Sequence, residues 1–294
     1  RSTQGVSSAA SDVYKRQGRR VAISGDGTTI AIGSMESSVN AGHVRIYGWD
    51  GGSWVQKGLQ LDGESAWDAF GHSIAFSNDG NIVAIGGAAN DGNGNDSGHV
   101  RVFSWDGSTW NQIGQDIDGE ASLDDSGYSI SLSSDGNTLA VGAPFNDGSS
   151  TNGGHVKIFT FDDSILNGQW IQLGQDIDGI EIAEVSGYSV ALAHDGMTVA
   201  IGAPSGVFTE NSGSVRVFTW LDGWIQLGED LDGEASGDRF GASVSLSSDG
   251  TFLAVGAPNN DNNGNSSGKA SIHFWNGTVS VSYTHLRAHE TRGN

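Results

Sequence analysis

One unit of eighteen residues, present in five copies, constrains this chain more than any other feature of its sequence. The clearest copy runs from Gly127 to Pro144 and reads GYSISLSSDGNTLAVGAP. The other copies begin at Gly18, Gly71, Gly187 and Gly241, so that neighbouring copies start 53 to 60 residues apart. Repeats of about this length are typical of propellers, solenoids and arrays, in which each repeat packs against the next.

Each copy predicts a β-hairpin. Asp135-Gly136 lies between two runs of β-prone residues, and Asp-Gly favours a two-residue turn in which both residues have positive φ. After the turn, Leu139, Val141 and Ala143 share one face, and the residues between them are also small and apolar. A strand that is apolar on both faces is expected between two layers of the protein.

Two further strands follow each hairpin. In the second repeat the third strand is HVRVFSW from His99, and the fourth begins with tryptophan, as in WNQIGQDI from Trp110. Four antiparallel strands in a repeat of about 55 residues predict a propeller blade. We therefore expect an all-β fold, a β-propeller of four-stranded antiparallel blades. Five repeats are present, and the last ends before a tryptophan-led strand, which predicts an open or incomplete ring.

The repeats set the expected domain boundaries. The blades should cover about residues 18–70, 71–126, 127–186, 187–240 and 241–280. The ends, residues 1–17 and 281–294, share no motif with the repeats and resemble translated adapter sequence. We interpret both as non-native or disordered, and the repeats as part of a longer chain.

Composition excludes several classes of partner. The net charge is −21, which disfavours nucleic acids and anionic membranes, because both attract basic surfaces, and favours cations or a basic partner. No apolar run approaches the roughly 20 residues that cross a bilayer. The chain contains no cysteine, so disulfides are excluded.

The segment from Asp238 to Asp261, DRFGASVSLSSDGTFLAVGAPNND, resembles the FG-GAP repeat, the blade unit of integrin alpha-chain propellers. Phe240-Gly241 and Gly256-Ala257-Pro258 supply the letters of that motif. The W-x-Q-x-G strand and the D-I-D-G-E connector resemble a subgroup of these repeats in bacterial and algal surface proteins. The resemblance covers about residues 18–277.

The resemblance implies an extracellular or cell-surface module for adhesion or binding of a protein or glycan ligand, and no catalysis. A lectin or a polysaccharide-acting enzyme that uses one propeller face is the alternative. An enzyme would need acids or a histidine that depart from the repeat and gather at one place. The family's calcium loop at the first hairpin is missing here, because a single aspartate, such as Asp135, stands where D-x-D-x-D-G is expected.

Calcium has other candidate ligands, in the loop after the second strand. Aspartate and asparagine alternate there in two repeats, a pattern that can turn several oxygens toward one ion. The candidates are Asp91, Asn93 and Asn95 in one loop, and Asp261, Asn263 and Asn265 in the other. Ordinary polar turns explain the same residues, because Asn, Asp and Gly tolerate left-handed backbone. N-glycosylation sequons at Asn95, Asn265 and Asn276 would compete with calcium at two of these positions.

Other polar residues recur in every blade and therefore suggest structure more than chemistry. Acids of the connectors, such as Asp116 and Glu120, are expected to bind backbone amides of their own turns. Histidines begin the third strand in three blades, at His43, His99 and His155, too far apart to share a metal with one another. The tryptophans are expected to pack between blades.

One stretch departs from its counterparts. The loop from Ser205 to Gly213 in the fourth repeat contains Val207, Phe208 and Glu210, which have no equivalent in the other blades. We therefore expect these three residues to contact a ligand.

Overall fold

The computed structural model describes residues 17–34, 41–148, 150–204, 211–262, 264–275 and 280–286, with only the backbone described for residues 17–19 and 280–286. Over these ranges the chain forms 24 β-strands and no helix. Consequently no helix of the described chain is long and apolar enough to span a membrane.

The strands form five antiparallel sheets, each built from consecutive segments of the chain. The first contains β1 (Gln17–Ile23), β2 (Thr29–Ser34), β3 (His43–Trp49), β4 (Trp54–Gln56) and β5 (Leu61–Asp62). The second contains β6 (Phe70–Phe76), β7 (Ile82–Gly87), β8 (His99–Trp105), β9 (Trp110–Gln112) and β10 (Ile117–Asp118). The third contains β11 (Ser129–Leu132), β12 (Thr138–Ala143), β13 (His155–Asp162), β14 (Gln169–Gln172) and β15 (Ile177–Asp178).

The fourth sheet contains β16 (Ser189–Leu192), β17 (Thr198–Ala203), β18 (Ser214–Trp220), β19 (Trp224–Gln226) and β20 (Leu231–Asp232). The fifth contains β21 (Ser243–Leu246), β22 (Phe252–Ala257), β23 (Lys269–Trp275) and β24 (Ser280–Leu286). β24 lies mostly within residues 281–294, the segment that sequence analysis set apart from the repeats. The strand bounds do not otherwise test the predicted boundaries of the blades and of the two terminal segments.

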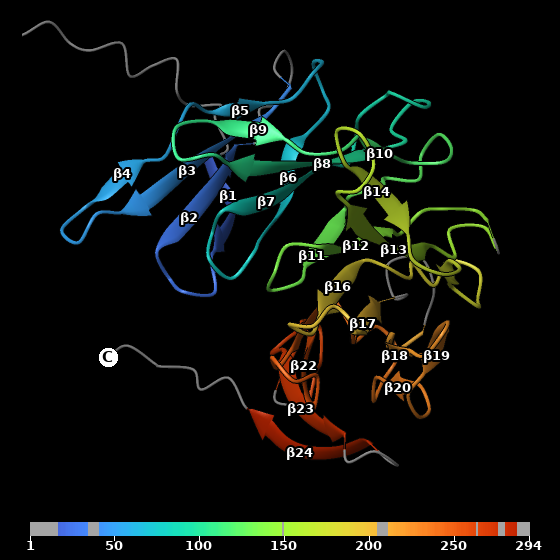
Figure 1. Ribbon diagram of the computed structural model, residues 1–294. Coiled ribbons are helices and arrows are strands. Elements are labelled where there is room, and N and C mark those ends of the chain that lie inside the picture. Colours follow the sequence, from blue (N-terminus) through green and yellow to red (C-terminus); the bar gives the residue numbers. More distant parts are fainter. Residues whose placement is uncertain are drawn as a thin grey trace, which may run out of the picture.

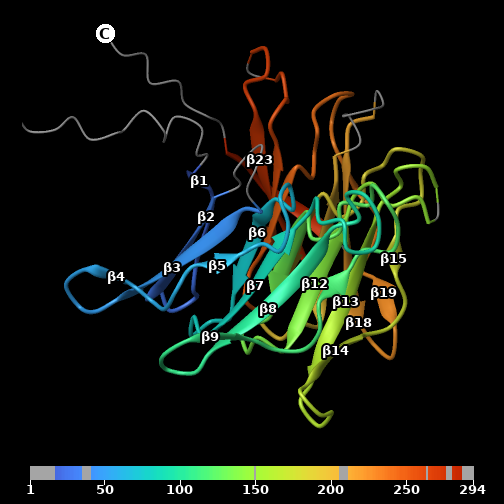
Figure 2. The same ribbon diagram turned by 90° about the horizontal axis from the view of Figure 1, so that it is seen from above.

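The five sheets follow one another in chain order around a common centre (Figures 1 and 2), from the blue first sheet to the red fifth sheet. The first strands of neighbouring sheets contact each other there, in the succession β1, β6, β11, β16 and β21. This is the arrangement of propeller blades, and it confirms the predicted fold class. Within the described residues, no sheet combines strands from the two ends of the chain.

The hairpin turn differs from the two-residue turn that the sequence suggested. Leu132 pairs with Leu139, and Ser133 N donates to Thr138 O at 2.8 Å, so the loop is longer than Asp135-Gly136. Gly136 has a φ of 78°, whereas Asp135 is not among the residues with positive φ. The reason lies in the side chain of Asp135, which accepts hydrogen bonds from Ser133 Oγ (2.6 Å) and Asn137 N (3.0 Å). Only the glycine therefore needs left-handed backbone.

The predicted fourth strand is split in two in the first four blades. In the first sheet, β4 and β5 both pair with β3, and Gly58 lies between them with a φ of 79°. A Cβ on Gly58 would come within 2.9 Å of the rings of Trp105 and Trp110 in the next blade. Trp110 Nε1 also donates to Lys57 O at 2.8 Å. The break in the strand is thus the place where the tryptophan of the next blade packs, which confirms the expected role of these residues.

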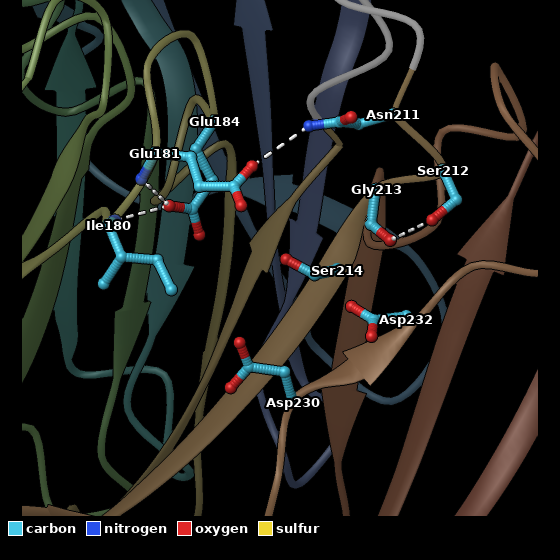
Figure 3. Close-up of a pocket in the computed structure, with 9 residues that line it drawn as sticks. All are labelled: Ile180, Glu181, Glu184, Asn211, Ser212, Gly213, Ser214, Asp230 and Asp232. Atoms are coloured by element: carbon cyan, nitrogen blue, oxygen red, sulfur yellow. Dashed lines mark hydrogen bonds between the residues drawn. The ribbon is translucent and has the colours of Figure 1, made fainter.

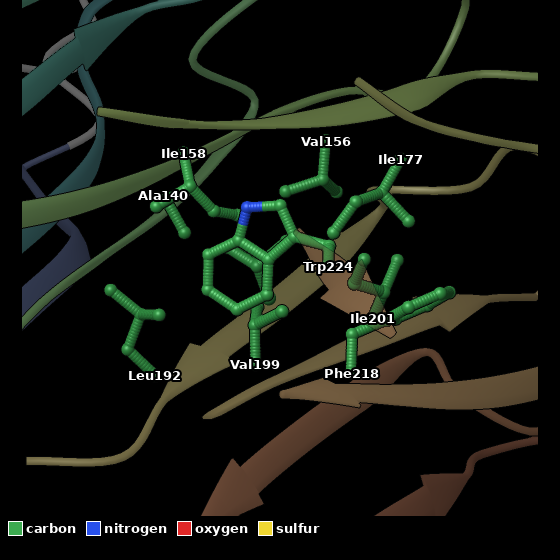
Figure 4. Close-up of a cluster of buried hydrophobic side chains, with 10 residues drawn as sticks. Ala140, Val156, Ile158, Ile177, Leu192, Val199, Ile201, Phe218 and Trp224 are labelled. Atoms are coloured by element: carbon green, nitrogen blue, oxygen red, sulfur yellow. The ribbon is translucent and has the colours of Figure 1, made fainter. Parts of the chain in front are cut away.

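The hydrophobic core lies between neighbouring sheets. Figure 4 shows one such cluster, in which Trp224 of the fourth sheet packs against Val156, Ile158 and Ile177 of the third. Trp224 Nε1 donates to Leu173 O at 2.8 Å, so the single polar atom of the buried ring is satisfied. Because each sheet is apolar on both faces, every blade needs a neighbour to bury its surface.

Candidate functional site

The acid three residues before the second to fifth copies of the repeat has a structural role, as expected. In every case its carboxylate accepts hydrogen bonds from backbone amides of its own connector. The donors are Glu64 and Ser65 N for Asp68, Ala121 N for Asp124, Ile180 and Glu181 N for Glu184, and Ala235 N for Asp238. These carboxylates stabilise their connectors, which leaves them little freedom for acid–base chemistry.

The first candidate calcium loop is held by hydrogen bonds to several partners. Asp91 Oδ1 accepts from Asp96 N at 2.8 Å, Asn93 Nδ2 donates to Gly119 O at 2.8 Å, and Asn95 Nδ2 donates to Asp96 Oδ2 at 2.7 Å. Each side chain therefore has a role within the fold, and the calcium assignment stays a prediction.

The second candidate loop repeats part of this pattern. Asp261 Oδ1 accepts from Ser266 N at 2.6 Å, as Asp91 does from Asp96 N. Asn265 follows the Asp261 turn, and Asn263 lies outside the described residues. The predicted contact residues Val207, Phe208 and Glu210 also lie outside them.

The histidines that begin the third strands meet connector acids at the junctions between blades. In one cluster His99 lies beside Glu64 and Asp116, and in the other His155 lies beside Glu120 and Asp176. Each cluster offers three ligand atoms within 4.8 Å of one another, so both could hold a metal ion. Although the histidines are far from one another, each is joined by one carboxylate from the preceding connector and one from its own.

The sequence predicted that these connector acids bind backbone amides of their own turns. The structure differs, because Asp116 and Glu120 contact side chains. Asp116 Oδ1 accepts from Gln112 Nε2 at 2.5 Å, and Glu120 forms an ion pair with Lys157. Burial lowers the pKa of both His99 and His155, although the nearby acids raise it in part. Both rings are therefore neutral near pH 7, which is the protonation state of a metal ligand.

A cavity replaces the histidine cluster at the junction of the third and fourth blades. Ser214 occupies the position of His99 and His155, and a cavity of about 240 Å³ opens beside it. Figure 3 shows carboxylates on several sides of this space, from Glu181, Glu184, Asp230 and Asp232. The loss of an imidazole ring thus leaves a polar, acidic hollow.

A second kind of pocket lies at the centre of the propeller, where the first strands of the blades meet. Its volume is about 360 Å³, and all five blades line it. At the residue after the first glycine, the second to fifth blades contribute His72, Tyr128, Tyr188 and Ala242. The first blade contributes Arg20, at the position that Ser73 has in the second. We refer to it as the axial pocket.

Aromatic rings follow one another along the axial pocket. The ring centroids of His72 and Tyr128 are 4.6 Å apart, and those of Tyr128 and Tyr188 are 4.9 Å apart. Arg239 lies over the Tyr188 ring at 5.6 Å and donates to its hydroxyl oxygen at 3.3 Å. Arg20 Nε donates to His72 O at 2.7 Å. Two arginines and three rings therefore gather at the centre of a strongly acidic chain.

The two tyrosines have pKa values shifted in opposite directions. Burial and the hydrogen bond to Tyr188 raise the pKa of Tyr128. Burial also acts to raise the pKa of Tyr188, but hydrogen bonds from Tyr128 and Arg239 outweigh it, and the pKa falls. Arg239, which donates to the Tyr188 oxygen, is the group that favours the ionised form of Tyr188 over that of Tyr128.

Sequence reasoning missed the axial pocket. A signal was present, because the residue after the first glycine of each repeat changes from His72 to Tyr128, Tyr188 and Ala242 while its surroundings repeat. The histidine clusters had a signal as well: Glu64 precedes His99 by the same interval at which Glu120 precedes His155.

Comparison with known proteins agrees with this architecture. A family model described as FG-GAP repeat matches residues 231–273, which therefore carry an FG-GAP repeat, as the sequence predicted. A search of curated proteins gives no match.

Two solved structures resemble the whole arrangement. Hydrazine synthase of Kuenenia stuttgartiensis has a TM-score of 0.58 and 16% identity, covering 89% of this chain and 64% of that one. A proposed 6-phosphogluconolactonase from Bacteroides uniformis has a TM-score of 0.61 and 16% identity, covering 91% of this chain and 71% of that one. At this identity the likeness shows the fold alone. The chain is a β-propeller that contains an FG-GAP repeat.

Proposed function

We propose that this chain is a ligand-binding and adhesion module of an extracellular or cell-surface protein, and that it is not an enzyme. The observation that carries the proposal is the axial pocket, where the residue after the first glycine changes from His72 to Tyr128, Tyr188 and Ala242 beside serines that repeat, such as Ser73 and Ser129. Variation confined to a concave surface on a rigid scaffold is typical of a recognition site. The extracellular setting is supported by the FG-GAP repeat at residues 231–273.

The chemistry of the axial pocket favours a ligand with a negative charge and a flat apolar face. The rings of Tyr128 and Tyr188 offer stacking surfaces, Arg20 lines the pocket with positive charge, and Arg239 adds charge from its place over the Tyr188 ring. Acidic oligosaccharides combine a carboxylate with the apolar face of a sugar ring. We therefore propose an acidic glycan as the ligand class. Binding of such a glycan is consistent with the proposed role in adhesion.

Binding of uronate-containing oligosaccharides, measured by calorimetry, tests this proposal. The fold itself supplies mild variants: Tyr188→Ala introduces the residue that the fifth blade has at this position, and Ala242→Tyr introduces the residue of the third and fourth. We expect Tyr188→Ala to weaken binding at least tenfold. Leu166→Ala, at an exposed position in the turn between β13 and β14, is the control and should bind as the parent does.

Three results would count against the axial pocket. These are no binding of any acidic glycan, equal binding by Tyr188→Ala and the parent, or equal loss in the Leu166→Ala control. Binding of neutral glycans alone would contradict the role of the arginines. Turnover of a glycan by the intact chain would favour the enzymatic alternative.

Calcium in the loop of Asp91, Asn93 and Asn95 is a further part of the proposal. Negative charge accumulates next to this loop: burial, followed by the charges of Asp96 and Asp124, raises the pKa of Asp125 to about 7. A cation bound there would relieve this repulsion. Titration with Ca²⁺ should release heat and raise the melting temperature, and Asp91→Asn should abolish both effects. If neither heat nor a shift is measured for the parent, calcium plays no part.

A further inference from the structure

The cluster of Glu64, His99 and Asp116 joins two blades. Glu64 lies in the connector after β5, so it belongs to the first repeat, whereas His99 begins β8 and Asp116 precedes β10 in the second. The Nδ1 atom of His99 is 4.0 Å from Asp116 Oδ2. This distance is too long for a hydrogen bond. In a tetrahedral zinc site with bonds of about 2.0 Å, two ligand atoms lie about 3.3 Å apart, so a small movement of the Asp116 side chain would bring the pair to that spacing.

His99 is the feature that distinguishes this cluster from an ordinary group of surface acids. Its side chain is fully buried, and both of its ring nitrogens have no hydrogen-bond partner. A buried polar atom without a partner is costly, and native proteins seldom tolerate one unless a water or an ion satisfies it. Nδ1 points to the two carboxylates. An ionised carboxylate accepts hydrogen bonds and cannot donate them, and the same is true of the unprotonated nitrogen of a neutral imidazole ring.

The packing around the ring fixes this orientation. Nε2 of His99 lies against Gly87, where an added Cβ would be only 2.8 Å away. The equivalent residue beside His155 is Ala143, and beside Ser214 it is Ala203. Because Nε2 of His99 packs against the backbone of Gly87, the Nδ1 edge of the ring is the one turned toward Asp116.

The two clusters differ in the basic residue that lies beside them. Arg101 lies 3.9 Å from both Glu64 and Asp116, and its hydrogen bonds go to Gln112 Oε1 and Asp62 O. In the other cluster, Lys157 forms a direct ion pair with Glu120 and a second, at 3.6 Å, with Asp176. An ammonium group there already supplies the positive charge.

We propose that Glu64, His99 and Asp116 bind a divalent transition-metal ion of the zinc class. One imidazole nitrogen and two carboxylate oxygens form a donor set that suits zinc and its neighbours better than calcium, which prefers oxygen alone. The side chain of Glu64 is 49% exposed and can move to close the shell, and water completes it. The ion would tie the first blade to the second.

Calorimetric titration of the EDTA-treated protein with Zn²⁺ tests this site, with a Co²⁺ absorption spectrum and a thermal melt as second and third readouts. The informative variant is His99→Ser, because the fourth blade carries Ser214 at the same position and folds around it. The matched control is His155→Ser in the other cluster. Titration with Ca²⁺ alone distinguishes this site from the loop of Asp91.

We expect one Zn²⁺ site per chain, a rise in melting temperature on binding, and visible Co²⁺ bands. His99→Ser should weaken Zn²⁺ binding at least tenfold and abolish the rise, whereas His155→Ser should change affinity less than twofold. Glu64→Gln should weaken binding without altering the melting temperature of the metal-free protein. Equal Zn²⁺ binding by His99→Ser and the parent, loss only in His155→Ser, or absence of Zn²⁺ binding by the parent would each overturn the proposal.

Discussion

Gly142 of β12 lies directly against the carbonyl oxygen of Gly187 in the next blade, so that a Cβ on Gly142 would be 2.2 Å from that oxygen. The same oxygen accepts a hydrogen bond from Ser129 Oγ at 2.7 Å. Neighbouring blades repeat both contacts. Gly86 faces the Gly127 oxygen, which Ser73 Oγ also binds at 2.7 Å. Backbone atoms of adjacent blades thus approach as closely as they can at the centre.

We therefore expect Gly142→Ala to lower the free energy of unfolding by about 3 kcal/mol, because a backbone oxygen cannot move aside as a side chain can. Gly256→Ala is the matched control. It occupies the same position in the fifth blade, and its closest neighbour is the hydroxyl of Ser243. Denaturation in urea should show a change within about 1 kcal/mol for Gly256→Ala. Similar losses in both variants would refute the role of the Gly187 carbonyl.

The tryptophans that lead the fourth strands should differ in their contribution to stability according to whether a preceding blade covers them. Trp170 is 2% exposed and donates from Nε1 to Ile113 O at 3.1 Å, whereas Trp54 of the first blade is 40% exposed. Trp170→Ala should cost about 3–5 kcal/mol, and Trp54→Ala about 1 kcal/mol. Chemical denaturation measures both. Equal costs would mean that the tryptophans act within their own sheets.

Arg216 and Glu184 form a buried ion pair beside the acidic cavity, with an N–O distance of 3.3 Å and side chains 5% and 6% exposed. Arg216→Met should lower the free energy of unfolding by about 3–5 kcal/mol, since it leaves a buried carboxylate without its partner. Arg45, at the same strand position in the first blade, donates to Gln60 Oε1 near the surface. Arg45→Met is the control, and its effect should stay near zero. The double variant Arg216→Met with Glu184→Gln should recover part of the loss.

Asp125 makes stability depend on pH. Burial, followed by the charges of Asp96 and Asp124, raises its pKa from 3.8 to about 7 in the folded protein. The folded state therefore keeps a proton that the unfolded chain releases above about pH 4. The resulting stabilisation is complete below that pH and is lost as the pH rises through 7.

Asp125→Asn should consequently raise the free energy of unfolding by about 1–2 kcal/mol at pH 8, after allowance for its partial exposure, and leave it nearly unchanged at pH 4. Asp249→Asn should act in the opposite direction. Hydrogen bonds from Ser247 and Thr251 lower the pKa of Asp249 to about 2, so its contribution exists above pH 3.8 and is lost as the pH falls toward 2. Urea denaturation at both pH values measures the two variants, and matching signs would contradict this account.

The repeat made the fold predictable, because each copy from Gly127 to Pro144 and its four neighbours must bury two apolar faces. Two details of the blade differ from the prediction for different reasons. The turn at Asp135 lengthens because its carboxylate binds Ser133 and Asn137, two residues away on either side, a local side-chain contact that competes with the two-residue turn. The fourth strand breaks at Gly58 because Trp110 of the next blade packs there. The second contact joins two copies and is not visible in one repeat considered alone.

The candidate sites were harder to predict for a related reason. The sequence singled out loops in which polar residues stand close together, such as Asp91 to Asn95. The histidine cluster instead combines Glu64, His99 and Asp116, which span two repeats. The axial pocket combines residues from all five blades. Sites assembled across blades leave only a periodic signal in the sequence. They are found by comparing the residues that occupy the same position in each repeat.

The closest contacts between neighbouring blades at the centre are made by serine hydroxyls and glycine backbones. Ser129 Oγ binds the Gly187 carbonyl of the next blade, while Tyr128, its neighbour in the chain, lines the central space and lies against the rings of His72 and Tyr188. We therefore expect substitution of Tyr128 to change the lining of the axial pocket while the Ser129 contact stays in place. Under the proposed function, a lineage of such proteins can acquire new binding preferences through substitutions at Tyr128 and its counterparts, with the spacing and curvature of the blades inherited intact.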